Sequence, residues 1–168
     1  MKQVVVLIFA LLLAYNLQAL PRDEYLTKDG KLGQILILKD GQGGFAGITG
    51  SIWTIDPDGS WEHKRFFNNR IDKAVQHGKL TTKKLKVLAD VLAHAQMNKL
   101  PARLGGFRGA NPHVVTLSWG KDQCVWSLPA GSPVPKYPDF PFGKLTSQES
   151  FAEIYQAMLK FLKTPKDK

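Results

Sequence analysis

The sequence predicts an α+β domain in which an antiparallel sheet of four to five strands has two helices packed on one face. Residues 115–119 and 124–128 alternate between apolar and polar side chains, which is typical of strands with one buried face. Residues 85–95 and 151–162 repeat apolar side chains at helical spacing, so each is expected to form a helix with one apolar stripe. Both stripes must be buried, and the sheet is the surface that can cover them.

Residues 1–19 have the pattern of an export signal. Lys2 precedes an apolar run from Val4 to Ala14, and Ala19 is the small residue that a signal peptidase needs. The run is too short to span a bilayer. We therefore expect cleavage after Ala19, no membrane span in the mature chain, and a secreted, periplasmic or cell-envelope protein. An uncleaved anchor is the alternative, because Leu17 is a weak match to the cleavage pattern.

The rest of the chain has the length of one domain. Residues 20–33 are polar and irregular and are expected to form a loose N-terminal arm. Residues 34–163 are expected to form the single α+β domain, and residues 164–168 a charged tail. The only cysteine in the sequence is Cys124, so an internal disulfide is excluded. Its place in an alternating strand predicts a small buried side chain and not a nucleophile.

Three strands are expected in the first half of the domain, at residues 34–39, 48–56 and 60–67. The second and third are joined by Asp56-Pro57-Asp58-Gly59. This is a turn, because proline sets φ at its second position and glycine accepts the left-handed conformation that closes it. Residues 68–79 are basic and poor in apolar side chains and are interpreted as a connector.

The first helix is expected to begin at Thr81 or Thr82, whose hydroxyl oxygen can accept a hydrogen bond from the free amides of the first turn. It ends before Pro101, since proline disfavours helical geometry in the residue before it. Residues 120–122 join the two alternating strands as a hairpin.

The second helix follows a segment, residues 129–143, that is too rich in proline for regular structure and is expected to be a surface loop. Thr146 is followed three residues later by Glu149, the spacing of a capping box. The last helix is therefore expected to begin at this point.

Catalytic and metal-binding signatures are missing from the sequence. The four histidines, at positions 63, 77, 94 and 113, lack the spacing that places two metal ligands on one face. There is no Gly-x-Ser-x-Gly motif and no phosphate-binding glycine loop. We expect no enzyme activity, no cofactor and no metal. An enzyme would need titratable side chains that converge in a cleft.

The net charge is +9 at pH 7, which favours acidic partners. The lysines are spread along the chain, so we expect an exposed basic face and no nucleic-acid partner. All four tryptophans fall on expected strands, where packing explains them. If Trp53 and Trp61 point outward together, they would form a stacking platform. The alternative function is therefore a cell-envelope protein without catalytic activity that contacts a carbohydrate or polyanion.

The segment from Asp40 to Gly47 places Phe45 among four glycines. Glycine is used where φ is positive or where another backbone comes close. Phe45 is therefore either a plug in the protein's own core or an anchor for a partner. Phe107 also lies between glycines, in the loop at residues 104–112, and could line the same side of the molecule.

The run Gly43-Gly44-Phe45-Ala46-Gly47-Ile48 resembles the Gly-Gly-Phe-Ala-Gly-Ile run near the start of emfourin-like proteins. The order of the later helix, hairpin and closing helix is also similar, so the resemblance spans residues 34–162. Emfourins inhibit thermolysin-like zinc metallopeptidases. The resemblance thus implies a binding protein whose partner is a secreted metallopeptidase.

The partner-binding residues expected from this resemblance are Gly43, Gly44, Phe45, Ala46 and Gly47, with assistance from Phe107. The pocket after the scissile bond of such enzymes prefers a bulky apolar residue, which Phe45 would supply. The chain departs from the family pattern in its export signal, in an extra hairpin from Trp53 to Phe67 with its basic connector, and in the proline-rich insertion at residues 129–143.

Overall fold

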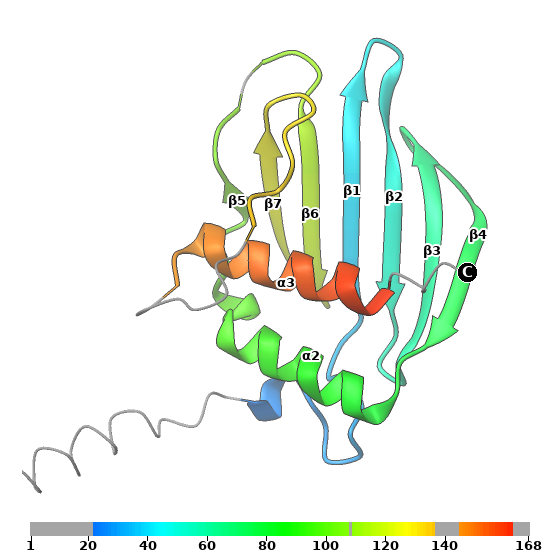
Figure 1. The fold of residues 1–168 in the computed structure, drawn as a ribbon, viewed down its shortest axis with the longest axis vertical. Coiled ribbons are helices and arrows are strands. Elements are labelled where there is room, and N and C mark those ends of the chain that lie inside the picture. Colours follow the sequence, from blue (N-terminus) through cyan, green and yellow to red (C-terminus); the bar gives the residue numbers. More distant parts are fainter. Residues whose placement is uncertain (1–21, 108, 137–144, 163–168) are drawn as a thin grey trace, which may run out of the picture.

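The protein consists of a seven-stranded mixed sheet with two helices on one face, as seen in a computed structural model that describes residues 22–107, 109–136 and 145–162 (Figure 1). The strands are β1 (Leu36–Gly44), β2 (Gly47–Ile55), β3 (Ser60–Phe67), β4 (Arg70–Lys79), β5 (Arg103–Leu104), β6 (His113–Trp119) and β7 (Asp122–Leu128), in the sheet order β4-β3-β2-β1-β6-β7-β5. The helices are η1 (Arg22–Glu24), α2 (Thr82–His94), η2 (Met97–Lys99) and α3 (Ser147–Leu162). The expected signal, the tail and residues 137–143 of the proline-rich loop lie outside the described residues.

The α+β class is confirmed, but the described sheet has more strands than expected and is not purely antiparallel. The segment expected as a connector contains β4, which pairs antiparallel with β3 from Lys79 to Arg70. Because β4 is an exposed edge strand, its side chains do not alternate in polarity, and the sequence pattern could not reveal it. β5 pairs parallel with β7 over only two residues, too few to leave a pattern.

The glycine-rich segment belongs mostly to a strand and not to a loop. β1 was expected to end at Lys39 but continues to Gly44, and it pairs with β2 down to Gly44 opposite Gly47. Gly41 and Gly50 lie opposite each other, and a Cβ on either would lie within 2.8 Å of the Phe66 ring. These two glycines therefore make room for an aromatic side chain of the neighbouring strand.

The hydrophobic core lies between the sheet and the two helices. Alternate side chains of β6 and β7 are buried, as the period of two predicted, and Leu36 and Leu38 of β1 are buried as well. The predicted helix stripes are buried as well, with Leu85, Leu88 and Leu92 on α2 and Phe151 and Ile154 on α3. Cys124 is also buried, as expected, and burial raises the pKa of its thiol to about 11.

Both predicted helix starts are confirmed by their caps. The Thr81 hydroxyl accepts a hydrogen bond from the Lys84 N–H at 3.3 Å. The Glu149 N–H donates to the Thr146 hydroxyl at 3.2 Å, and the Thr146 N–H donates to the Glu149 carboxylate at 2.7 Å. This reciprocal pair is the capping box that the spacing predicted.

The expectation of a loose N-terminal arm is wrong for residues 22–33. Tyr25 and Leu32 are both buried in the core, and the Tyr25 ring lies 5.4 Å from that of Trp119. The Tyr25 hydroxyl donates to Asn98 Oδ1 at 2.7 Å and accepts from the Asn98 N–H at 3.1 Å. Two apolar anchors separated by polar residues produce no periodic signal, so the pattern suggested a loose segment.

We expect Tyr25→Phe to lower the free energy of unfolding by about 1–2 kcal/mol, because it removes the hydroxyl that both accepts from and donates to Asn98. Urea unfolding monitored by tryptophan fluorescence measures this change. Lys28→Ala, an exposed change in the same segment, is the control and is expected to stay within about 0.5 kcal/mol of the wild type. Equal stability of the two variants would contradict the anchoring role of Tyr25.

Candidate functional site

Phe45 lies at the turn between β1 and β2, at one end of the sheet (Figure 1). Its accessible surface is 107% of the reference value, so the ring makes almost no contact with the rest of the chain. The interpretation of Phe45 as a core plug is therefore wrong. The other interpretation, an anchor for a partner, is the one compatible with this position.

The glycines beside Phe45 are used mainly by the protein itself. Gly47 has a φ of +130°, and a Cβ there would lie 2.1 Å from Asn68 Oδ1. A Cβ on Gly43 would lie 3.0 Å from the Asn111 backbone. The space at these two glycines is thus filled by neighbouring loops of the same chain. Gly44, Phe45 and Ala46 are the exposed residues of the expected binding segment.

On one side, the turn between β3 and β4 supports the β1–β2 hairpin. Asn68, in that turn, has the left-handed φ of 51°. Its side-chain oxygen accepts from the Ile48 N–H at 2.9 Å, and its own N–H donates to the Ile48 carbonyl at 2.7 Å. Two hydrogen bonds therefore hold the base of the Phe45 turn against the neighbouring hairpin.

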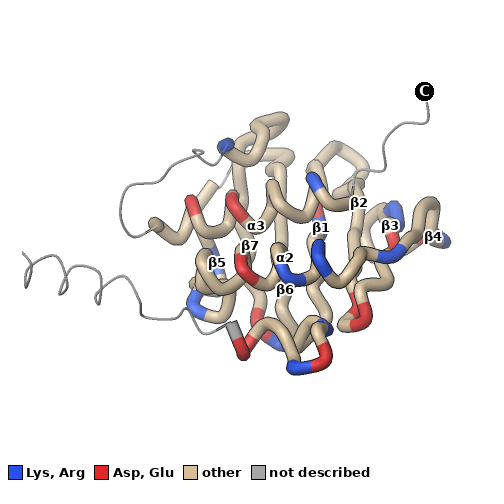
Figure 2. Tube along the Cα trace, turned by 60° about the horizontal axis from the view of Figure 1, so that its bottom comes forward, with Lys and Arg blue, Asp and Glu red and all other residues tan. Residues whose placement is uncertain are grey.

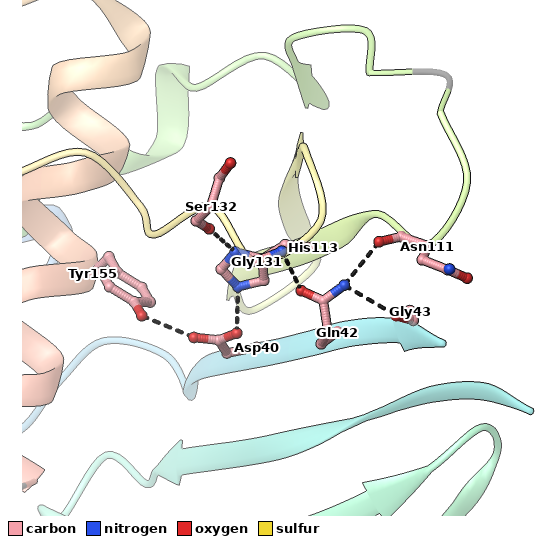
Figure 3. Close-up of polar contacts among 8 residues, drawn as sticks. All are labelled: Asp40, Gln42, Gly43, Asn111, His113, Gly131, Ser132 and Tyr155. Atoms are coloured by element: carbon pink, nitrogen blue, oxygen red, sulfur yellow. Dashed lines mark hydrogen bonds and ion pairs between the residues drawn. The ribbon is translucent and has the colours of Figure 1, made fainter. Parts of the chain in front are cut away.

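On the other side, Gln42 ties the hairpin to two loops that are distant in the sequence (Figure 3). Its side-chain nitrogen donates to the Asn111 carbonyl at 2.8 Å, and its side-chain oxygen accepts from the Gly131 N–H at 3.0 Å. The Gly43 N–H also donates to the Pro112 carbonyl at 2.7 Å. The turn that carries Phe45 is thus held from both sides.

Behind these contacts, a polar network joins α3 to the sheet (Figure 3). His113 Nε2 lies 2.7 Å from Asp40 Oδ1, and its Nδ1 lies 2.5 Å from the Ser132 carbonyl. The Tyr155 hydroxyl donates to Asp40 Oδ2 at 2.8 Å. Both imidazole nitrogens and both carboxylate oxygens are occupied by internal partners, so the network is suited to holding the loops and not to proton transfer with a substrate.

Burial and the nearby Asp40 carboxylate raise the pKa of Tyr155 above its ordinary value of 10.0. The folded state therefore keeps the phenol proton at a pH where the unfolded state has lost it. The stability that this provides is present below pH 10 and is lost as the pH rises above it.

We expect Tyr155→Phe to be about 1–2 kcal/mol less stable than the wild type at pH 7, because it leaves an oxygen of Asp40 without its donor. Above pH 10 the free energy of unfolding should fall less steeply in the variant than in the wild type. Urea unfolding between pH 7 and pH 11 measures both effects. Identical alkaline slopes would show that Tyr155 does not carry this pH dependence.

Three further exposed apolar side chains lie toward the Phe45 end of strands β2, β3 and β4. Ile48 follows it on β2, Phe67 pairs with Thr49 at the end of β3, and Ile71 pairs with Phe66 at the start of β4. We call Phe45, Ile48, Phe67 and Ile71 the hairpin-tip patch, in which Ile48 and Ile71 lie on the sheet face opposite the helices and Phe67 points to the other face. The two residues from β3 and β4 were not predicted as site residues. The Asn68-Asn69 pair between apolar residues was the turn signal that could have revealed them.

Phe107 lies in the loop between β5 and β6, which reaches the same end of the sheet as Phe45 (Figure 1). Its ring is partly exposed, and with Leu104 and Val125 it lines a small hollow of about 220 Å³ beside β7. β6 and β1 separate this position from the β1–β2 turn in the sheet order. The loop of Phe107 reaches the end of the sheet that carries the hairpin-tip patch, but Phe107 itself lies beside Val125 and Ser127 of β7 and is not part of the patch.

The structure does not provide the stacking platform on which the carbohydrate alternative depended. Trp61 is buried, and Trp53 packs against the core with its ring stacked on His63 at 4.7 Å. The two tryptophans do not point outward together. Basic and acidic positions are interspersed along the chain (Figure 2).

Within the described residues, no three His, Cys, Asp or Glu side chains gather in the manner of metal ligands. The helices of the described part of the chain are all too short or too polar to cross a bilayer. Comparison of the sequence with family models and with curated proteins finds no match.

Proposed function

We propose that this protein is exported and inhibits a secreted thermolysin-like zinc metallopeptidase by docking the β1–β2 turn in its active-site cleft. The observation that carries this proposal is the full exposure of Phe45 on a turn held from both sides. In the docked complex, Phe45 fills the apolar pocket that follows the scissile-bond position. The resemblance of Gly43–Ile48 to emfourin-like proteins supports this class of partner.

Docking is favourable because burial of the Phe45 ring contributes a large apolar free energy, while the turn loses little conformational entropy. Burying an exposed aromatic ring in a fitting pocket contributes about 2 kcal/mol or more to an interface. Because the hydrogen bonds of Asn68 and Gln42 hold the turn in place before binding, little backbone freedom is lost on docking. Gly44 and Ala46 add little bulk beside the ring, so a narrow cleft can accept it.

Phe45 alone is too small to form a stable interface. Specific complexes bury about 800 Å² on each partner. Ile48 and Ile71 on one face of the sheet and Phe67 on the other add exposed apolar surface beside the turn, and such neighbours can exclude water from a central anchor. We infer that the hairpin-tip patch forms the centre of the contact and that the loop of Phe107 lies at its margin.

The test is a titration of thermolysin with the protein, following hydrolysis of a peptide substrate. We expect stoichiometric inhibition of thermolysin and no effect on trypsin, a peptidase that does not use zinc. A zinc-sensitive dye should detect no released metal, because inhibition is by docking and not by removal of zinc. Full thermolysin activity at a micromolar excess of the protein would contradict the proposal.

We expect Asn68→Ala to weaken inhibition about fivefold although Phe45 is unchanged, because the turn loses its side-chain hydrogen bond to Ile48 and must be ordered on binding. The inhibition constant against thermolysin measures this. Asn69→Ala, in the neighbouring residue of the same turn, is the matched control and should inhibit as the wild type does. Equal constants for the two variants would show that the held turn does not matter.

A further inference from the structure

The face of the sheet opposite the helices carries a groove of about 890 Å³. Leu36 and Leu38 of β1 point into the helix-covered core, so Ile37 and Lys39 between them point to the other face. Side chains from β2, β3, β4, β6, β7 and the turn between β3 and β4 complete the lining. The volume falls in the range of about 300–1,000 Å³ that small-molecule sites occupy.

The floor of the groove is an aromatic ring. Phe66 is only 2% exposed although neither helix covers this face. Its ring occupies the space left by Gly41 and Gly50, whose missing side chains would otherwise fill it. Ile37, Ile52 and Val114 are half-buried in the same groove and add apolar surface to this floor, while threonine, serine, asparagine and glutamine side chains form the rest of its uncharged lining.

The groove also carries positive charge. The Lys39 ammonium lies 4.3 Å above the centre of the Phe66 ring. Among the described residues, no carboxylate forms an ion pair with Lys39, whereas Lys64 is paired with Glu62. No Asp or Glu of the described chain lines the groove. A cation without a carboxylate partner, over an apolar floor, attracts an anion that has an apolar body.

We propose that this groove binds a free long-chain carboxylate of the fatty-acid class. Its hydrocarbon chain lies along Ile37, Ile52 and Val114, and its carboxylate contacts the Lys39 ammonium. A second copy of this chain is a poor occupant, because it would bring the Lys39 ammonium groups of both copies into one groove. Phe45 does not line the groove, whereas Ile48 and Ile71 of the hairpin-tip patch do, so the proposal is tested by decanoate binding and not by inhibition.

The test uses decanoate as the probe and decan-1-ol as a neutral ligand of equal chain length. Titration of either into the full chain is followed by amide chemical shifts in NMR spectra. We expect decanoate to shift amides of β1, β2 and β6 and to bind more tightly than the alcohol. Shifts confined to the helix-covered side, equal affinities for the two ligands, or no binding up to the solubility limit would each overturn the proposal.

Variants separate charge from packing. Lys39→Met keeps an apolar stem and should weaken decanoate binding about tenfold while leaving decan-1-ol unchanged. Ile52→Glu places a carboxylate in the groove and should also reject decanoate. Lys84→Met, an exposed change on α2, is the control. Unchanged decanoate binding in both groove variants would overturn the proposal. The proposal would also be overturned if the same amides shifted when only the protein concentration was raised, because this would show that a second copy of the chain binds to this face.

Discussion

Phe45→Ala is expected to weaken inhibition of thermolysin by about 30-fold or more, which corresponds to the loss of about 2 kcal/mol of binding free energy. The ring is fully exposed in the free protein, so its removal creates no cavity and the stability of the fold should not change. The entire effect should therefore appear in the inhibition constant. Measuring that constant together with the urea midpoint distinguishes lost contact from lost folding.

The matched control for this change is Val87→Ala, which removes an exposed apolar side chain from α2. It should inhibit as the wild type does, because α2 lies on a face of the sheet away from the tip (Figure 1). Phe45→Leu keeps an apolar side chain and should retain part of the inhibition. If Phe45→Ala and Val87→Ala gave the same constant, the β1–β2 turn would not be the docking element.

Gly50→Ala is expected to lower the free energy of unfolding by about 3 kcal/mol. A Cβ at this position would lie 2.0 Å from the Asp40 carbonyl oxygen and 2.6 Å from the Gly41 Cα, both in the backbone of β1. Backbone atoms cannot rotate away as a side chain can, so the two strands would have to separate. The added methyl would also press on the Phe66 ring at 2.8 Å.

Urea unfolding measures this loss, and Gly106→Ala is the control. Nothing lies within 4 Å of a Cβ at Gly106, and its φ is not in the left-handed region, so we expect a change within about 0.5 kcal/mol. If both substitutions changed the free energy of unfolding by a similar amount, the effect at Gly50 would come from the flexibility of glycine and not from close packing. The predicted difference requires that Gly50 acts through close packing of β1 and β2.

Local sequence features predicted those parts of the fold that depend on neighbours along the chain. The capping box at Thr146 and the apolar stripe after it are complete within a few turns of helix, so no distant contact is needed to recognise α3. β4 depends instead on its pairing with β3, and because its side chains are almost all exposed, they show no polar–apolar alternation that would predict a strand. The buried position of Tyr25 likewise depends on Asn98, which is distant in the sequence.

In the candidate site, too, some features could be predicted from neighbouring residues and others depend on residues distant in the sequence. Residue identities alone singled out Phe45, because an aromatic among glycines is unusual, but they left open whether it was a plug or an anchor. Ile71 was missed because it lies on the unrecognised strand β4. Gln42 was not singled out either, since its role is to reach two loops that follow much later in the chain.

The sequence by itself determined that this chain forms a layer of strands covered by two helices, because apolar spacing along each element decides which side must leave water. Only the tertiary structure decided that Phe45 is exposed and that the protein's own loops fill the space beside Gly43 and Gly47. The physical reason is that the burial of a residue depends on what packs across from it. For Phe45 and its glycines, those neighbours come from strands and loops that sequence spacing cannot place.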